Sequence, residues 1–241
     1  MTPLASAPRG PVEVPDAVRA RVRDPEAVWR NELGGLTFRD SRAGRYLKWN
    51  PVGTGISLAA ERDRLVWAVR FHPVPEVLEY AADERGELLV TRAIPGESAV
   101  APRWVREPRA AVRAIGEGLR ALHEALPVIA CPFSWSSESR LARLDPVVGD
   151  ELGDPPPVDR LVVCHADACA PNTIVGPDGR WSGHVDLAAL GVADRWADLA
   201  VAAMSLGWNY GEGWDDEFHD AYGVEPDRER IAYYRALWNA G

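Results

Sequence analysis

The sequence predicts an α+β fold of two lobes, in which an antiparallel sheet with one helix precedes a mainly helical lobe. Segments with strand-like composition, separated by turn residues, fill residues 27–90. An apolar stripe at helical spacing begins at Val112. A chain of 241 residues, 46% of them hydrophobic, is long enough for one large domain or two small lobes. We expect the boundary at the Ala93-Ile94-Pro95-Gly96 break, which gives lobes of residues 1–93 and 94–241.

The first lobe is predicted to hold five short strands and one helix. Its first 20 residues begin with a Pro- and Ala-rich stretch, and we expect them to be a flexible leader. Turn residues at Gly34-Gly35 and at residues 41–44 and 83–86 separate strands expected at residues 27–30, 36–39, 45–49, 77–80 and 87–90. Residues 58–69 lack Gly and Pro and place Leu58, Leu65 and Val69 on one face, which predicts a helix.

The second lobe is predicted to be mainly helical. Pro108 opens a helix whose apolar stripe consists of Val112, Ile115, Leu119, Leu122 and Leu126. Residues 127–160 show no clear periodicity and are expected to be irregular. A short strand is expected at residues 161–163, followed by a hairpin of residues 173–175 and 181–185 around a Gly-Pro-Asp-Gly turn. Further helices are expected at residues 195–206 and 228–238.

Composition narrows the classes of function. Residues 150–230 contain 17 acidic and 5 basic side chains, which argues against a nucleic-acid partner and suits a small cationic substrate. No run of 18 uncharged apolar residues exists to span a membrane. Three cysteines without a paired motif favour a reducing cytoplasm. Of the 27 basic residues only Lys48 is a lysine, which suggests a site that needs a compact ammonium group.

One stretch carries the pattern of a phosphoryl-transfer site. His165, Asp167 and Asn172 follow a predicted strand in the order H-x-D-x-x-x-x-N, and Asp186 follows fourteen residues after the Asn. This arrangement is typical of the kinase catalytic loop and its metal-binding Asp. A carboxylate has to orient the acceptor hydroxyl and take its proton, and oxygen ligands have to hold Mg²⁺. We therefore expect Asp167 to be the base, and Asn172 and Asp186 to be metal ligands.

Lys48 and Glu61 complete this set. Lys48 lies on the third predicted strand, and Glu61 lies thirteen residues later in the predicted helix. Kinases use such a pair to align the nucleotide phosphates. The Gly34-Gly35 turn either covers the phosphates or is a plain hairpin turn. No P-loop of the GxxxxGK[ST] type is present.

The chain resembles aminoglycoside phosphotransferases over nearly its whole length, and among them the 3'-hydroxyl kinases (kanamycin kinases). The resemblance is carried by residues 164–172, 182–187, 190–199, 221–224 and 230–235. It implies a protein-kinase-like bilobal fold, ATP or GTP as phosphoryl donor, two Mg²⁺ ions and resistance to an antibiotic. It further implies that a hinge at residues 91–93 holds the purine through backbone groups of Thr91 and Ala93. The expected enzyme is a monomer or a homodimer.

Two departures from the family pattern concern substrate and loop geometry. Trp238 and Asn239 stand where the family has an acidic pair that binds the drug, and Ala166 stands where it has Gly. The acceptor therefore stays open between the 3'-hydroxyl of an aminoglycoside, streptomycin and another hydroxylated amino sugar or metabolite.

Two hypotheses that assign the protein to other functional classes also remain. His165 with Asp167 and His184 with Asp186 form two HxD pairs, which a metal-dependent hydrolase would use. The alternative is a catalytically weak nucleotide-binding pseudokinase. Zinc content and substrate-dependent ATP consumption discriminate these readings from a kinase.

Overall fold

The computed structural model describes residue 8 and residues 10–31, 33–55 and 57–240. They form two compact units. The first comprises the described residues up to Val69 together with Pro75–Ala93, and the second comprises Arg70–Val74 and the chain from Ile94 onward. None of the helices found within the described ranges is both long and apolar enough to cross a membrane.

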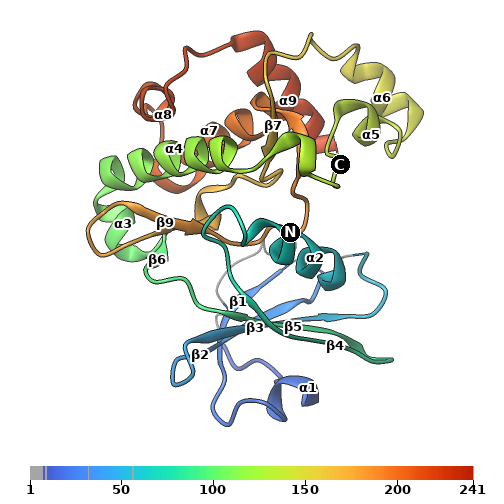
Figure 1. Ribbon diagram of the computed structural model, residues 1–241, viewed down its shortest axis with the longest axis vertical. Helices are drawn as coiled ribbons and strands as arrows, with labels where there is room; N and C mark the ends of the chain where they lie inside the picture. Colours follow the sequence, from blue (N-terminus) through green and yellow to red (C-terminus); the bar gives the residue numbers. More distant parts are fainter. Residues whose placement is uncertain (1–7, 9, 32, 56, 241) are drawn as a thin grey trace. The chain divides into compact units, whose positions relative to one another are not determined.

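The first unit is built on a five-stranded antiparallel sheet with the order β1-β2-β3-β5-β4 (Figure 1). Its strands are β1 (Glu26–Arg30), β2 (Leu36–Asp40), β3 (Arg45–Pro51), β4 (Val77–Ala82) and β5 (Gly86–Arg92). Lys48 lies on the central strand β3, opposite Thr37 of β2 and Leu89 of β5. All five predicted strands are confirmed.

Helix α2 (Leu58–Ala68) confirms the predicted helix of this unit. Ser57 caps it, because its side chain accepts a hydrogen bond from the N–H of Ala60. Leu58 and Leu65 are buried as expected, but Val69 is 42% exposed. The prediction for Val69 was wrong because the helix ends at Ala68, one residue before that position.

The expectation of a flexible leader over residues 1–20 is wrong in part. Residues 1–7 and 9 lie outside the described residues. Asp16–Arg19 form a short helix, α1, and its Val18 is fully buried against the apolar side of the sheet. Burial of Val18 and Val22 beside Phe38 and Leu47 fixes this segment to the first unit.

The second unit is mainly helical and contains two small sheets, of order β10-β7 and β6-β8-β9. Its longer elements are α4 (Pro108–Ala125), α7 (Trp196–Tyr210), α8 (Asp215–Tyr222) and α9 (Arg228–Ala240). Its shorter elements are β6 (Glu97–Ser98), α3 (Pro102–Arg106), η1 (Val128–Ala130), α5 (Ser137–Leu141), α6 (Pro146–Leu152), β7 (Leu161–Cys164), η2 (Ala170–Asn172), β8 (Thr173–Val175), β9 (Trp181–His184) and β10 (Gly191–Asp194).

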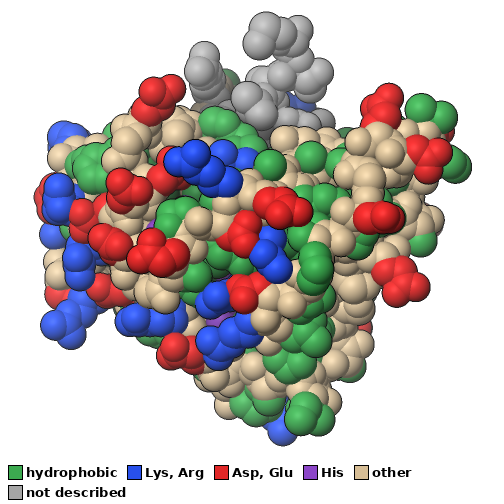
Figure 2. Space-filling model, turned by 90° about the horizontal axis from the view of Figure 1, so that it is seen from above, with side chains coloured by type: hydrophobic (Ala, Val, Ile, Leu, Met, Phe, Trp, Pro, Cys, Tyr) green, Lys and Arg blue, Asp and Glu red, His purple; other side chains and the backbone are tan. Residues whose placement is uncertain are grey.

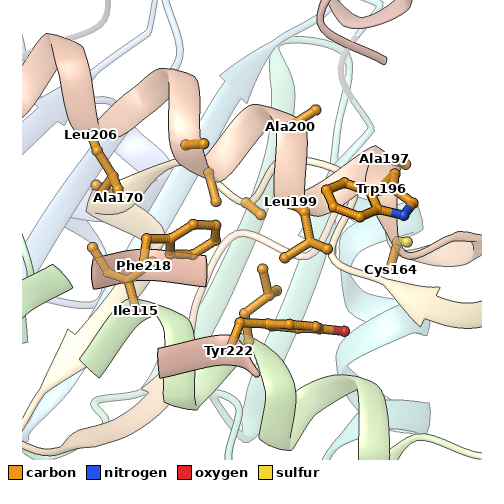
Figure 3. Packing of buried hydrophobic residues seen from close by; sticks show 14 of the residues in the cluster. Ile115, Cys164, Ala170, Trp196, Ala197, Leu199, Ala200, Leu206, Phe218 and Tyr222 are labelled. Carbon is orange, nitrogen blue, oxygen red and sulfur yellow. The ribbon is translucent and has the colours of Figure 1, made fainter. Parts of the chain in front are cut away.

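The apolar stripe of α4 lies in the core of this unit. All five predicted residues are at most 3% exposed. Figure 3 shows Ile115 of this stripe among Phe218 and Tyr222 of α8 and residues of α7. Gly116 lets α4 and α8 approach closely, because a Cβ at this position would lie 2.8 Å from the Cβ of Ala221.

On the face drawn in Figure 2, acidic and basic side chains are interspersed with apolar ones.

The prediction of an irregular stretch over residues 127–160 was wrong, because η1, α5 and α6 lie within it. Local capping explains two of these helices. Ser136 accepts from the N–H of Ser139 at the start of α5, and Asp145 accepts from the N–H of Val147 before α6. Pro146 then occupies the first turn of α6, where it is tolerated. Such short helices show too few turns for a periodic apolar pattern.

Candidate active site

The loop that follows β7 has an unusual backbone held by one buried carboxylate. Ala166 has φ 68°, in the left-handed region that non-glycine residues rarely occupy. Asp198 of α7 is fully buried, and its carboxylate accepts the backbone N–H groups of His165 at 2.6 Å and of Ala166 at 2.7 Å. It also lies 2.9 Å from Nε2 of His123 on α4. Two helices of the second unit therefore fix the start of this loop.

The side chains of Asp167 and Asn172 are brought together by this loop. The amide nitrogen of Asn172 donates to the backbone oxygen of Asp167 at 2.9 Å and lies 3.3 Å from its Oδ2. Oδ1 of Asp167 is buried and accepts no hydrogen bond within the described part of the chain. A buried carboxylate oxygen without a donor is costly, and it is common at sites that bind a proton, hydroxyl or cation.

Burial raises the pKa of Asp167 above its ordinary value. The charge of Asp186 raises this pKa further, whereas His165, the thiol of Cys169 and the amide of Asn172 lower it. The two carboxylates are therefore close enough to repel each other.

Asp186 is positioned by β9 and by the loop itself. The backbone N–H of Val185 donates to the oxygen of Asn172 at 2.9 Å, which ties the end of β9 to the loop. Asp186 then has φ 65°, a conformation that Asp tolerates better than most residues. Asp167, Asn172 and Asp186, predicted from sequence spacing, are thus neighbours in the second unit.

These three side chains suit a hard divalent cation. The amide nitrogen of Asn172 donates to Asp167. The amide oxygen of Asn172 takes no part in those bonds and can therefore act as a metal ligand. Carboxylate and amide oxygens are the ligands that Mg²⁺ takes, and a cation would relieve the repulsion between Asp167 and Asp186. The donor set therefore fits magnesium.

Lys48 and Glu61 form an ion pair within the first unit. Nζ of Lys48 lies 2.7 Å from Oε1 of Glu61, and the Glu61 side chain is only 4% exposed. This bond joins the central strand β3 to α2. A buried carboxylate holds the lysine side chain in one orientation, whereas an exposed ion pair would leave it flexible.

The predicted hinge and the glycine turn have their N–H groups engaged within the first unit. The N–H of Ala93 donates to the oxygen of Gly44, and the N–H of Arg92 donates to the oxygen of Glu76, both at 2.9 Å. Thr91 is buried on β5. In the Gly34-Gly35 turn, the side chain of Asn31 accepts the N–H of Gly35 at 2.6 Å, so this turn is built as a hairpin turn.

Sequence reasoning missed three residues that support the loop: Asp198, His123 and Ser205. Oγ of Ser205 accepts the N–H of Ala170 at 2.9 Å. Ser205 lies about two turns beyond Asp198 on α7, on the same side of the helix. The sequence does contain a signal for Asp198. It is a lone carboxylate in an otherwise apolar helix, and such a group needs buried donors.

The two HxD pairs do not form a transition-metal site. Among the described residues, the one cluster with metal-ligand spacing is His123, Cys164 and Asp198. Hydrogen bonds account for this cluster, since the Asp198 carboxylate accepts three N–H groups and the Cys164 thiol donates to the oxygen of Asp194. Nδ1 of His184 lies 2.9 Å from Nε2 of His72, and Nε2 of His165 lies 2.9 Å from the backbone oxygen of Val185, so both HxD histidines use a ring nitrogen in a protein hydrogen bond.

Comparison with known proteins identifies relatives of this chain. The model of the phosphotransferase enzyme family (APH) matches residues 38–234. Streptomycin 3''-kinase of Streptomyces griseus is 35% identical over 88% of this chain and 90% of the relative. An aminoglycoside 3'-phosphotransferase of Streptomyces fradiae is 36% identical over 78% and 81%, respectively.

A solved structure agrees with these relatives. Aminoglycoside phosphotransferase APH(3'')-Id from Streptomyces rimosus superposes with a TM-score of 0.73 at 29% identity, covering 93% of this chain and 96% of that one. Its complex with ADP and streptomycin superposes with a TM-score of 0.65 at 31% identity, covering 84% and 88%. The predicted protein-kinase-like α+β fold is thereby confirmed, and the chain belongs to the phosphotransferase enzyme family (APH).

Proposed function

We propose that this protein transfers the γ-phosphoryl group of ATP or GTP to a hydroxyl of an aminoglycoside antibiotic and so confers resistance. The observation that carries this proposal is the loop geometry, in which a buried, unsatisfied oxygen of Asp167 lies beside Asn172 and Asp186. Within the proposal, residues 1–93 bind the nucleotide, and residues 94–241 perform catalysis and bind the acceptor.

Each residue has a distinct task. Asp167 accepts a hydrogen bond from the acceptor hydroxyl and takes its proton as the hydroxyl oxygen bonds to the γ-phosphorus. The bond from that phosphorus to the bridging oxygen breaks, so the products are a phosphate ester and a nucleoside diphosphate. Lys48, aligned by Glu61, neutralises the nucleotide phosphates. Thr91 and Ala93 contact the purine through backbone groups, and Ala93 uses its carbonyl oxygen for this because its N–H donates to the oxygen of Gly44.

Asn172 and Asp186 would hold the metal, which we expect to be two Mg²⁺ ions. When bound, Mg²⁺ neutralises charge on the phosphate oxygens. Cys131, Cys164 and Cys169 form no disulfide with one another, which suits a reducing compartment, and we assign the enzyme to the cytoplasm as a monomer or homodimer.

The acceptor is an aminoglycoside, with two candidate positions. The names of the relatives support both the 3'-hydroxyl of a kanamycin-type drug and the 3''-hydroxyl of streptomycin. The match to the streptomycin kinase covers more of both chains. In the resemblance to the 3'-hydroxyl kinases, Trp238 and Asn239 stand where an acidic pair is expected. We therefore favour streptomycin.

A coupled ADP- or GDP-release assay with streptomycin and kanamycin tests the proposal. We expect turnover that requires Mg²⁺ and one of the two drugs. The matched control is Asp167→Asn, which should lower kcat by about 10²–10⁴-fold while nucleotide binding is retained. Wild-type protein without drug-dependent turnover, or an Asp167→Asn variant with normal kcat, would contradict the assignment.

A further inference from the structure

The first turn of α2 is attached to the sheet of the first unit by one carboxylate. Oε2 of Glu87, on β5, accepts the backbone N–H of Leu58 at 2.7 Å. Leu58 is the first residue of α2, so its N–H has no partner within the helix. The partial positive charge at a helix N-terminus strengthens a bond to an anionic acceptor. Glu87 therefore binds the start of α2 to β5 through a directed bond.

The carboxylate of Glu87 is itself held by β4. Its Oε1 accepts the hydroxyl of Tyr80 at 2.6 Å, and this bond raises the pKa of Tyr80 above its ordinary value. The guanidinium carbon of Arg62 on α2 lies 4.5 Å from the centre of the Tyr80 ring. Leu58 and Arg62 are one helical turn apart, so α2 contacts the Glu87-Tyr80 pair at two places.

These side chains share one side of the sheet with Lys48. Leu89 of β5 is directly opposite both Lys48 of β3 and Tyr80 of β4, and directly opposite residues point to the same side of a sheet. Glu87 precedes Leu89 by two residues on β5, so it points to that side as well. Helix α2 covers this side of the sheet, whereas α1 covers the other (Figure 1).

The position of Glu61 depends on the same turn of the helix. Glu61 follows Leu58 by three residues, and its Oε1 lies 2.7 Å from Nζ of Lys48. Apolar contacts also hold α2, through buried residues such as Leu65. Apolar contacts are not directional, whereas a hydrogen bond to a carboxylate fixes both direction and distance. The bond from Leu58 to Glu87 can therefore fix the place at which Glu61 meets Lys48.

We propose that Glu87 is a positioning residue which, together with Tyr80, holds α2 in the register in which Glu61 orients Lys48. Glu87 acts through the helix, because it binds the N–H of Leu58 and the helix carries Glu61 to the lysine. Loss of this bond leaves a folded protein that aligns the nucleotide less well. The inference rests on the proposed function, because it assumes that Lys48 neutralises the nucleotide phosphates.

The test uses Lys48 as a probe, because it is the only lysine in the sequence. Protein made with lysine labelled with ¹³C at Cε gives one Cε–Hε NMR signal, which reports the environment of this side chain without nucleotide. Glu87→Leu removes the acceptor and keeps the volume, whereas Glu87→Gln keeps an amide oxygen that can accept the Leu58 N–H. Glu61→Gln gives the signal of the lysine without its ion pair. Glu84→Ala, at an exposed acidic residue of the same hairpin, is the matched control.

We expect the Lys48 signal of Glu87→Leu to move toward that of Glu61→Gln, and the signal of Glu87→Gln to move less. The coupled assay should show the nucleotide KM raised about fivefold in Glu87→Leu and less than about twofold in Glu87→Gln, because a neutral acceptor replaces part of the lost bond. The acceptor KM should stay unchanged in both variants. Glu84→Ala should change neither the signal nor the nucleotide KM.

This inference and the proposed function fail separately. The Lys48 signal needs neither nucleotide nor turnover, so it decides the role of Glu87 even if the wild type phosphorylates no drug. An unchanged signal in folded Glu87→Leu overturns the proposal. So does an equal change of signal in Glu84→Ala, or a nucleotide KM that rises while the signal stays in place.

A second variant covers the case in which Glu87→Leu does not fold, as measured by circular dichroism. Tyr80→Phe keeps the ring beside Arg62 and removes only the hydroxyl that holds the Glu87 carboxylate. We expect a smaller movement of the Lys48 signal in the same direction. A signal identical to that of the wild type in this variant contradicts the proposal in the same way.

Discussion

The backbone N–H of Ala166 donates to Oδ1 of Asp198 across 2.7 Å, and Ala166 at the same time has φ 68°. An L-residue with a side chain in this region costs about 1–2 kcal/mol. The buried carboxylate offsets that strain, because it also accepts the N–H of His165. A carboxylate of α7 therefore holds the conformation of the loop that follows β7.

Substitution of Ala166 separates strain from packing. Ala166→Gly removes the strain, but it also removes a buried methyl group worth about 0.8 kcal/mol and makes the unfolded chain more flexible. We expect the free energy of unfolding to change by less than about 1 kcal/mol. Ala166→Val places a branched side chain in the same conformation and should cost about 3 kcal/mol. Urea denaturation measures both values, and equal stabilities for the two variants would refute this account.

Lys48 should not be replaceable by arginine. Its ammonium group lies 2.7 Å from a nearly buried carboxylate, and a longer planar fork changes that geometry while keeping the charge. We expect Lys48→Arg and Glu61→Gln each to raise the nucleotide KM or lower kcat at least about tenfold. Asp63→Asn, which breaks the exposed pair with Arg62 on the same helix, is the control and should leave both constants unchanged. Normal kinetics of Lys48→Arg would show that any positive charge suffices.

The residue pairs of the candidate site whose types and spacing are typical of one kind of chemistry were predictable from the sequence. Lys48 with Glu61, and Asp167 with Asn172, are residue types that only a few functions place at these spacings, and the structure brings each pair together. The hairpins β1-β2, β2-β3 and β4-β5 followed from turn residues between short strands, whereas the pairing of β3 with β5 was not predicted. Asp198 was not predicted because its role depends on α7 packing against a loop about thirty residues earlier in the chain.

Elements stabilised mainly by tertiary contacts were also missed. Helix α8 has four acidic residues among its eight, so its sequence does not show a broad apolar face. It forms because Phe218 and Tyr222 are buried against α4, and because Tyr222 lies within hydrogen-bond distance of His123. A single sequence does not reveal such partners.

The cysteines should differ in reactivity. Burial holds the pKa of Cys164 well above its ordinary value, and burial together with the charge of Asp167 raises the pKa of Cys169. Only the thiolate reacts, so both should react slowly, whereas Cys131 is partly exposed. We expect one fast thiol with a disulfide reagent at pH 8, and none in Cys131→Ser. Three thiols should react after unfolding, and a second fast thiol in the folded protein would contradict the prediction.

Stability should fall in mild acid because of His72. Its ring stacks on Trp181, with Nε2 bonded to Nδ1 of His184, and burial lowers its pKa from 6.5 to about 4. Below pH 6.5 the unfolded chain binds a proton that the folded protein binds only near pH 4. The free energy of unfolding should therefore decrease over this range, by up to about 1.4 kcal/mol per pH unit for this group.

His72→Gln tests this contribution to acid sensitivity. Gln does not titrate, so the slope of stability against pH between 6.5 and 4 should become shallower by about one proton. Lost packing at His72 shifts stability by a constant at every pH, which leaves the slope as the informative measurement. Burial also lowers the pKa of His184, so part of the slope should remain in the variant. Urea denaturation at several pH values gives the slope, and an identical slope in wild type and variant would show that His72 binds its proton equally in both states.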